Sequence, residues 1–240
     1  MNLQTLPKRT FSITILALLL LALTTAVASA DAPAVYEVTI TNLTTGQPFT
    51  PPAVVTHRQA VDLFNVGDPA SEGIKEIAEN GNLAPLLDAV NNAKHVSDVV
   101  VATGDIPPLL PNTSVTFEIT GDRGAKFISF ASMLICTNDG FTGVDTLRLP
   151  KKVGDTASAY TSAYDAGTEI NTEDFADIVP PCQGLVGVSS DDAGTGMSNP
   201  ALAENGVITM HPNVQGGNDL LTGVHGWADP VAMIEVVRIN

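Results

Sequence analysis

The chain has 240 residues, 26 of them acidic and 11 basic, which gives a formal net charge of −15 at neutral pH. A surface with this charge repels phosphate groups, which argues against nucleic acids and anionic membranes as partners. Divalent cations are attracted by the same charge, although acidity by itself also serves to keep an exported protein soluble.

Residues 1–30 have the three parts of a secretory signal peptide. Lys8 and Arg9 precede an apolar run over residues 11–23, and a small-x-small cleavage sequence ends at Ala30. The alternative is a signal-anchor helix, but a spanning helix needs about 20 apolar residues, and small residues follow this run. We therefore expect cleavage near Ala30 and a secreted or periplasmic protein without membrane insertion.

The exported part, residues 31–240, has the length of one domain with its own hydrophobic core. It contains two cysteines, Cys136 and Cys182. A pair of cysteines in an oxidising compartment most often forms a disulfide, which is our prediction here. Two buried free thiols are the alternative.

Strand-like alternation begins soon after the signal peptide. In residues 35–43, apolar Tyr36, Val38 and Ile40 alternate with polar side chains, which is the period of a strand with one face in the core. Residues 113–120 repeat the pattern. Further strand candidates are residues 96–102, 126–135, 207–211 and 231–239. Because Gly, Pro and Asn separate these segments, we predict a mainly β fold, an antiparallel sandwich.

One helical region interrupts the strands. Asp68 is expected to cap a helix that begins at Pro69 and ends before Gly81. A second helical pattern places apolar residues at positions 83, 86, 87 and 90. We expect this short helical insertion to pack on the sheet or across one end of it.

Residues 139–204 are rich in Gly, Ser, Thr, Asp and Pro and have little periodicity. We predict long ordered loops there, and loops on a β scaffold are where function usually lies. Two segments in this region are rich in oxygen ligands, one at Asp139 and one over residues 164–169. Carboxylates from two loops suit Ca²⁺, which takes six to eight hard oxygen ligands. Ordinary acidic turns are the alternative explanation of this spacing.

Enzymatic signatures are missing from the sequence, which has no Gly-x-Ser-x-Gly, phosphate-loop, His-Glu-x-x-His or Cys-x-x-Cys motif. The histidines show no ligand spacing; they are His57, His95, His211 and His225. We expect no catalysis. The alternative is a metal-assisted or His/Asp hydrolase that uses His57, His211 or His225.

Several motifs resemble the spondin N-terminal domain family, and they cover most of the exported part. Residues 49–57, with the downstream segments 64–67, 70–74 and 77–81, look like bacterial members of that family. Residues 127–145 are similar to the family's strand that leads into Pro-Asp-Trp-x-x-Gly. Residues 164–169, with the sequence YDAGTE, resemble its Trp-Asp-Ala-Gly-Thr-Asp segment.

The resemblance implies a C2-like antiparallel β-sandwich of about eight strands, with one calcium ion held by loops at one end. Matching the motifs assigns Asp139, Asp165 and Glu169 as the metal ligands. The chain departs from the family pattern at Glu169, where the family has aspartate, and beside Asp139, where Asn138 and Gly140 replace proline and tryptophan.

We therefore expect a secreted, calcium-binding sandwich that acts in extracellular recognition or adhesion. Its partner would be an extracellular protein or surface ligand that the sequence does not name. A purely structural cell-surface domain that needs no ion is a further alternative to this function.

Overall fold

The computed structural model describes residues 32–104 and 108–240, so the predicted signal peptide lies outside the described residues. From Pro33 to Asn240 the chain forms one compact unit. Within the two described segments, no helix combines the length and the apolar character needed to cross a bilayer.

Ten strands in the described residues form two antiparallel sheets, two more strands than the family resemblance implies. The four-stranded sheet has the order β4 (Ser114–Gly121), β1 (Ala34–Asn42), β10 (Ala232–Arg238) and β7 (Thr156–Thr161). The six-stranded sheet has the order β3 (Val96–Val101), β2 (Ala53–His57), β5 (Phe127–Met133), β6 (Gly140–Arg148), β8 (Ala163–Asp165) and β9 (Thr209–Met210). The mainly β, antiparallel fold that the sequence predicts is confirmed.

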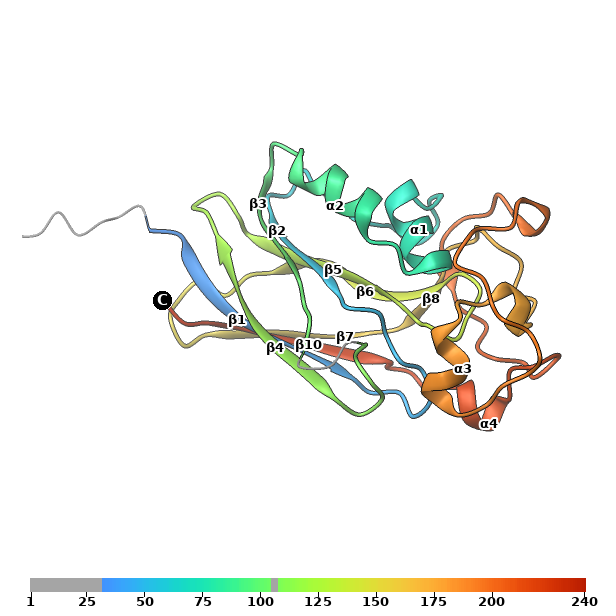
Figure 1. The fold of residues 1–240 in the computed structure, drawn as a ribbon. Coiled ribbons are helices and arrows are strands. Elements are labelled where there is room, and N and C mark those ends of the chain that lie inside the picture. The colour runs from blue at the N-terminus through green and yellow to red at the C-terminus, as the bar shows by residue number, and fades with distance from the viewer. Residues whose placement is uncertain (1–31, 105–107) are drawn as a thin grey trace, which may run out of the picture. The chain divides into compact units, whose positions relative to one another are not determined.

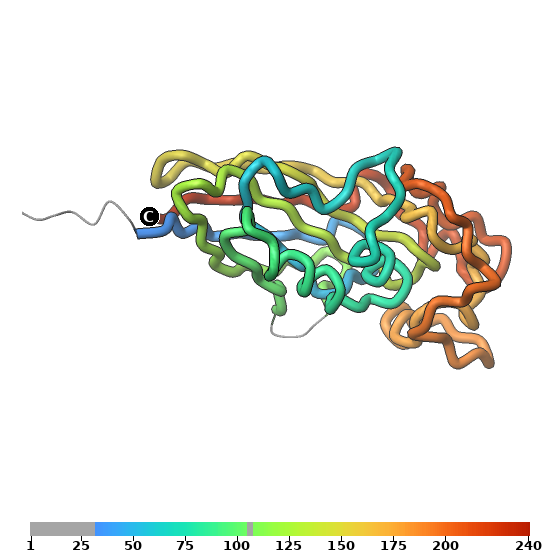
Figure 2. The backbone as a smooth tube through the Cα atoms, turned by 90° about the horizontal axis from the view of Figure 1, so that it is seen from above, coloured from blue at the N-terminus to red at the C-terminus, as the bar shows by residue number. Residues whose placement is uncertain are grey.

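Two helices, α1 (Glu72–Asn80) and α2 (Ala84–Asn91), lie over the six-stranded sheet, as Figure 1 and the view from above in Figure 2 show. The shorter helices are α3 (Pro181–Val186), α4 (Thr222–His225) and the 3₁₀-helices Phe175–Asp177 and Pro200–Leu202. They lie among the loops at the end of the sandwich opposite the C-terminus. We call this the loop end.

Helix α1 begins later than the sequence predicts. The cap is Ser71 rather than Asp68, because the Ser71 hydroxyl accepts a hydrogen bond from the amide of Ile74 at 3.3 Å. The predicted end is confirmed: Gly81 follows the helix with a φ of 64°, in the left-handed region.

Two hydrophobic layers explain why the two sheets have different sequence patterns. One layer lies between the sheets and contains Val38, Val54 and Phe130. The other lies between the six-stranded sheet and the helices and contains Val55 and Ile77. The four-stranded sheet has one face in the core, so β1 and β10 alternate between buried and more exposed residues. Strands β2 and β5 are buried on both faces and show no such alternation.

The prediction of loops throughout residues 139–204 is wrong in its first part, where β6, β7 and β8 lie. Alternation of polar and apolar residues does not predict these strands, for a physical reason. β6 is buried on both faces over its first four residues, and β7 consists of small and hydroxyl residues with one tyrosine. The remainder, after β8, consists of loops and short helices.

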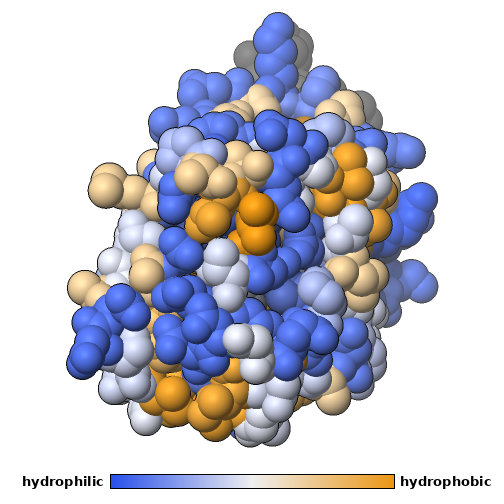
Figure 3. All heavy atoms as spheres, turned by 90° about the vertical axis from the view of Figure 1, so that its right-hand side faces the viewer, coloured by the Kyte–Doolittle hydropathy of each residue, from blue (hydrophilic) through white to orange (hydrophobic). Residues whose placement is uncertain are grey.

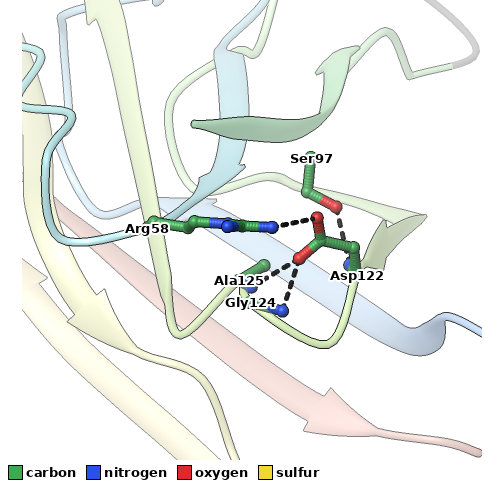
Figure 4. Close-up of polar contacts among 5 residues, drawn as sticks. All are labelled: Arg58, Ser97, Asp122, Gly124 and Ala125. Atoms are coloured by element: carbon green, nitrogen blue, oxygen red, sulfur yellow. Dashed lines mark hydrogen bonds and ion pairs between the residues drawn. The ribbon is translucent and has the colours of Figure 1, made fainter. Parts of the chain in front are cut away.

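An ion pair fixes the turn that joins β4 to β5 (Figure 4). One terminal nitrogen of Arg58 lies 3.1 Å from Oδ2 of Asp122. The other carboxylate oxygen accepts hydrogen bonds from the amides of Gly124 and Ala125, at 2.6 and 2.7 Å. The amide of Asp122 donates to Ser97 Oγ at 2.6 Å. Over the whole described part of the chain this is the only salt bridge, so the other acidic groups there have no basic partner.

Cys136 and Cys182 form a disulfide with their Cα atoms 5.1 Å apart, which confirms the prediction and rules out two free thiols. The bond joins the turn after β5 to α3. The same turn is held by Gln47, whose amide nitrogen donates to the carbonyls of Cys136 and His225 at 3.1 and 2.7 Å. The loop end is therefore covalently tied to the sheet.

Candidate metal centre

The pairing of β6 with β8 brings Asp139 and Asp165 together. Asp139 directly precedes β6, and the first residue of that strand, Gly140, lies opposite Asp165 at the end of β8. The amide of Ala166 donates to the carbonyl of Asp139 at 3.1 Å. Two aspartates that are 26 positions apart in the sequence therefore lie at the same end of adjacent strands.

The Asp139 side chain is fully buried and only half satisfied. Its Oδ2 atom accepts hydrogen bonds from the amides of Thr168 and Glu169, at 2.8 and 3.1 Å. Its Oδ1 atom is buried and has no hydrogen-bond partner. A buried polar atom without a partner costs roughly 1 to 3 kcal/mol, and more when the group is charged. A ligand bound at this oxygen would remove that cost.

A third carboxylate, that of Glu204, completes the group. One oxygen atom from each of Asp139, Asp165 and Glu204 lies within 4.8 Å of the other two. The Glu204 segment is held in place by its backbone, since the amide of Gly206 donates to the carbonyl of Gly167 at 2.7 Å. Three separate parts of the chain thus bring carboxylates to one point.

Gly167 makes this approach possible. Its φ is 67°, and a Cβ atom at this position would lie 2.5 Å from the carbonyl oxygen of Val207. The amide of Gly167 also donates to Asp165 Oδ1 at 2.8 Å, while Asp165 Oδ2 accepts from the side-chain nitrogen of Asn171 at 2.6 Å. The loop after β8 is therefore closed around the Asp165 carboxylate.

Glu169, the third ligand that the resemblance implies, is not a member of this group of three. Its side chain is 3% exposed, and its Oε1 atom accepts a hydrogen bond from the amide of Asn199 at 3.4 Å. The backbone of Glu169 still contributes to the site by donating to Asp139. Its role as a ligand stays a prediction. Glu204 is not predicted by the sequence, because it lies in a polar segment without any motif, and its acidity is its only signal.

The electrostatics of the site favour a cation. Burial, followed by the negative charge of Asp165, raises the pKa of Asp139 to about 7, although hydrogen bonds from Thr168 and Glu169 act in the opposite direction. Burial, followed by the negative charge of Glu79, raises the pKa of Glu169 to about 7. In the residues that the structure describes, no basic side chain forms a salt bridge with any of these carboxylates.

These shifts predict how the stability of the calcium-free protein depends on pH. The folded state holds the Asp139 proton up to a pKa of about 7, against 3.8 for the free carboxyl group. The resulting stabilisation is complete below the lower value and is lost as the pH rises through the upper one. We expect the free energy of unfolding by urea, measured in EDTA, to fall over this interval. The fall should be shallower in Asp139→Asn, which cannot titrate there; equal slopes would contradict the assignment.

The histidines of the hydrolase alternative lie in three separate environments. His57 Nε2 lies 2.7 Å from Ser129 Oγ, and this hydroxyl lies 3.3 Å from Oδ1 of Asp145. His57 and Ser129 are both fully buried, so this network fixes β2, β5 and β6 to one another. His211 packs against Trp227, and the remaining candidate, His225, lies beside the disulfide.

These observations define the class of protein: an antiparallel sandwich with helices on one sheet and a carboxylate site at the loop end. The model of the spondin N-terminal family, Spondin_N, matches residues 39–174, more than half of the chain, so the chain belongs to this family. No curated protein matches it. The family and the disulfide fit an extracellular protein. The match contains Asp139, Asp165 and Glu169, while Glu204 lies beyond its end.

Proposed function

We propose that this exported spondin-like domain binds Ca²⁺ at its loop end through Asp139 and Asp165, with Glu204 as a third carboxylate, and acts without catalysis in extracellular recognition or adhesion. The observation that carries the proposal is the buried Oδ1 atom of Asp139, which has no hydrogen-bond partner and belongs to a carboxylate that lies beside two others. Calcium fits this donor set because it accepts carboxylates, carbonyls and water at flexible angles.

A bound ion would join the start of β6, the end of β8 and the segment around Glu204, and so order the loops. Figure 3 shows the loop end, where separate hydrophobic patches lie among hydrophilic residues. Five large apolar side chains between β8 and β10 are exposed: Ile170, Met197, Val207, Met210 and Leu221. We propose that they supply the apolar part of a surface that contacts a partner.

An open cavity of about 380 Å³ adds a second element to the proposed contact surface. Thr45, Asn213 and Trp227 are among its lining residues. The Trp227 ring lies 5.0 Å from that of His211. Burial lowers the pKa of His211 to about 4, and the negative charge of Asp165 acts in the opposite direction. We therefore expect the order of the carboxylate site to influence this cavity, and we propose an extracellular protein or surface ligand as its partner.

Thermal unfolding in EDTA and in millimolar calcium tests the metal proposal. With a dissociation constant of about 10⁻⁴ M, at the tight end of extracellular modules, calcium at a hundred times this constant, about 10⁻² M, stabilises the fold by about 2.7 kcal/mol. For a domain of this size the melting temperature should rise by roughly 5 to 10 °C. Equal melting temperatures with and without calcium would overturn the proposal and favour a structural domain that needs no ion.

A further inference from the structure

In the described chain, the outer edge of the four-stranded sheet at β7 has no strand beside it. β7 pairs only with β10, in a register without interruption. The amide of Arg238 donates to the carbonyl of Asp155 at 3.1 Å, and every second residue of an antiparallel strand bonds to the same neighbour. The backbone groups of Thr156, Ser158 and Tyr160 therefore point away from β10. Within the described residues, no backbone hydrogen bond joins them to another segment.

β7 also lacks the features that usually protect a sheet edge from pairing with another chain. Its sequence, TASAYT, contains no charged residue, proline or glycine. The edges at β3 and β4 are joined to each other, because the Asp98 carboxylate in β3 accepts hydrogen bonds from the amide and hydroxyl of Thr120, at 2.8 and 2.7 Å. The edge strand β9 has only two residues. Short length, charge and coverage block an edge, so among the described strands β7 is the edge that is left unblocked.

Charge is divided between the two ends of the sandwich. Of the 11 basic residues, nine follow the predicted signal peptide, and only Lys75 of these lies in α1. The other eight lie within a few residues of strand ends at the C-terminal end of the sandwich, which we call the basic end: Arg58, Lys94, Arg123, Lys126, Arg148, Lys151, Lys152 and Arg238. The opposite, loop end contains the carboxylate site and a second acidic group, formed by Asp174, Asp192 and Asp219.

We propose that two copies of this chain pair through β7, as antiparallel edge strands related by a two-fold axis at Ser158. In this register Ser158 faces its counterpart and Tyr160 faces Thr156 of the second copy, so about six backbone hydrogen bonds join the copies. Tyr160 is 68% exposed in the single chain and would pack across this interface. The two four-stranded sheets become one continuous sheet. This pairing goes beyond the proposed function and needs no bound ion.

Charge complementarity selects a second copy as the occupant of this edge. The formal net charge of −15 opposes self-association in general, and parallel pairing would place like ends together. Antiparallel pairing reverses the second copy, so the basic end of each copy lies toward the loop end of the other. The turn that precedes β7 contains Lys151 and Lys152, both exposed, and it would approach the acidic groups of the other copy. The attraction arises twice, once on each side of the axis.

Sedimentation velocity in EDTA, over the micromolar range of protein concentration, tests this pairing. We expect a monomer–dimer equilibrium that weakens as salt screens the charges. Ser158→Pro should raise the dissociation constant at least about tenfold, since it removes an outward amide from each copy. Proline is tolerated on an edge strand where the amide faces away from the sheet, so the ladder with β10 is kept. Ser158→Lys should also disrupt the dimer, without a backbone change, because it places two like charges opposite each other.

Ser158→Thr is the matched control, because it keeps the amide and adds no charge, and it should dimerise like the unmodified protein. A monomer at every concentration would overturn the proposal and leave the calcium site unaffected, since the measurement is made without the ion. A dimer that is unchanged in both Ser158→Pro and Ser158→Lys would also overturn it, because the interface would then lie elsewhere. The double substitution Lys151→Glu and Lys152→Glu should weaken the dimer; an unchanged dimer would contradict the reversed orientation.

Discussion

Replacing Asp139 with asparagine should abolish the rise in melting temperature that calcium produces. The substitution removes the charge from a fully buried carboxylate that lies beside those of Asp165 and Glu204 and whose Oδ1 atom has no hydrogen-bond partner. Calcium affinity depends on the number of charged ligands. We therefore expect the dissociation constant to rise about a hundredfold or more, to about 10⁻² M or above. In EDTA the substitution should raise the melting temperature, because the variant no longer buries a carboxylate with a pKa of about 7. Calorimetric titration and melting curves measure the two effects.

Asp192→Asn is the control for this experiment. Asp192 is an exposed member of a different acidic group, with Asp174 and Asp219. Because both substitutions replace aspartate with asparagine, the two variants have the same net charge. It should keep the full response to calcium. A normal response in Asp139→Asn, or a loss of response in both variants, would show that general acidity and not this site attracts the ion.

Removing the disulfide with the double substitution Cys136→Ala and Cys182→Ala should lower the free energy of unfolding by about 4 kcal/mol. This figure follows from a closed loop of 46 residues, which restricts the unfolded chain. Both cysteines are fully buried, and alanine keeps the site apolar. The loop contains Asp139, Asp165 and Glu169, so its release should also weaken the response to calcium. Urea unfolding of the two proteins measures the difference.

The unmodified protein, unfolded and refolded in the presence of a thiol reductant, is the matched control for the double variant. It differs from the double variant only by two thiol groups in place of two hydrogen atoms, so it should lose a similar amount of stability. A loss below about 1 kcal/mol in both would mean that packing around Gln47 and α3 holds the loop end without the covalent bond.

Much of the fold can be predicted from the sequence, through the family's motifs and the period-two pattern of the strands. β1, β4 and β10 are predictable because one face of their sheet meets water, which forces polar and apolar residues to alternate. β6 and β7 are not, because double burial in β6 and small side chains in β7 remove the alternation, and β8 has only three residues. The start of α1 is also a tertiary matter, since Asp68 and Ser71 are both acceptable caps by sequence.

The candidate site divides in the same way between sequence and structure. Asp139 and Asp165 follow from motifs that lie next to paired strands, and the pairing of β6 with β8 turns their distance in the sequence into contact. Glu204 was decided by tertiary structure alone, since a lone acidic residue carries no pattern that distinguishes a ligand from a solvated side chain. Local sequence can specify a strand or a turn, whereas burial of a charge beside other charges depends on which distant segments the fold packs against it.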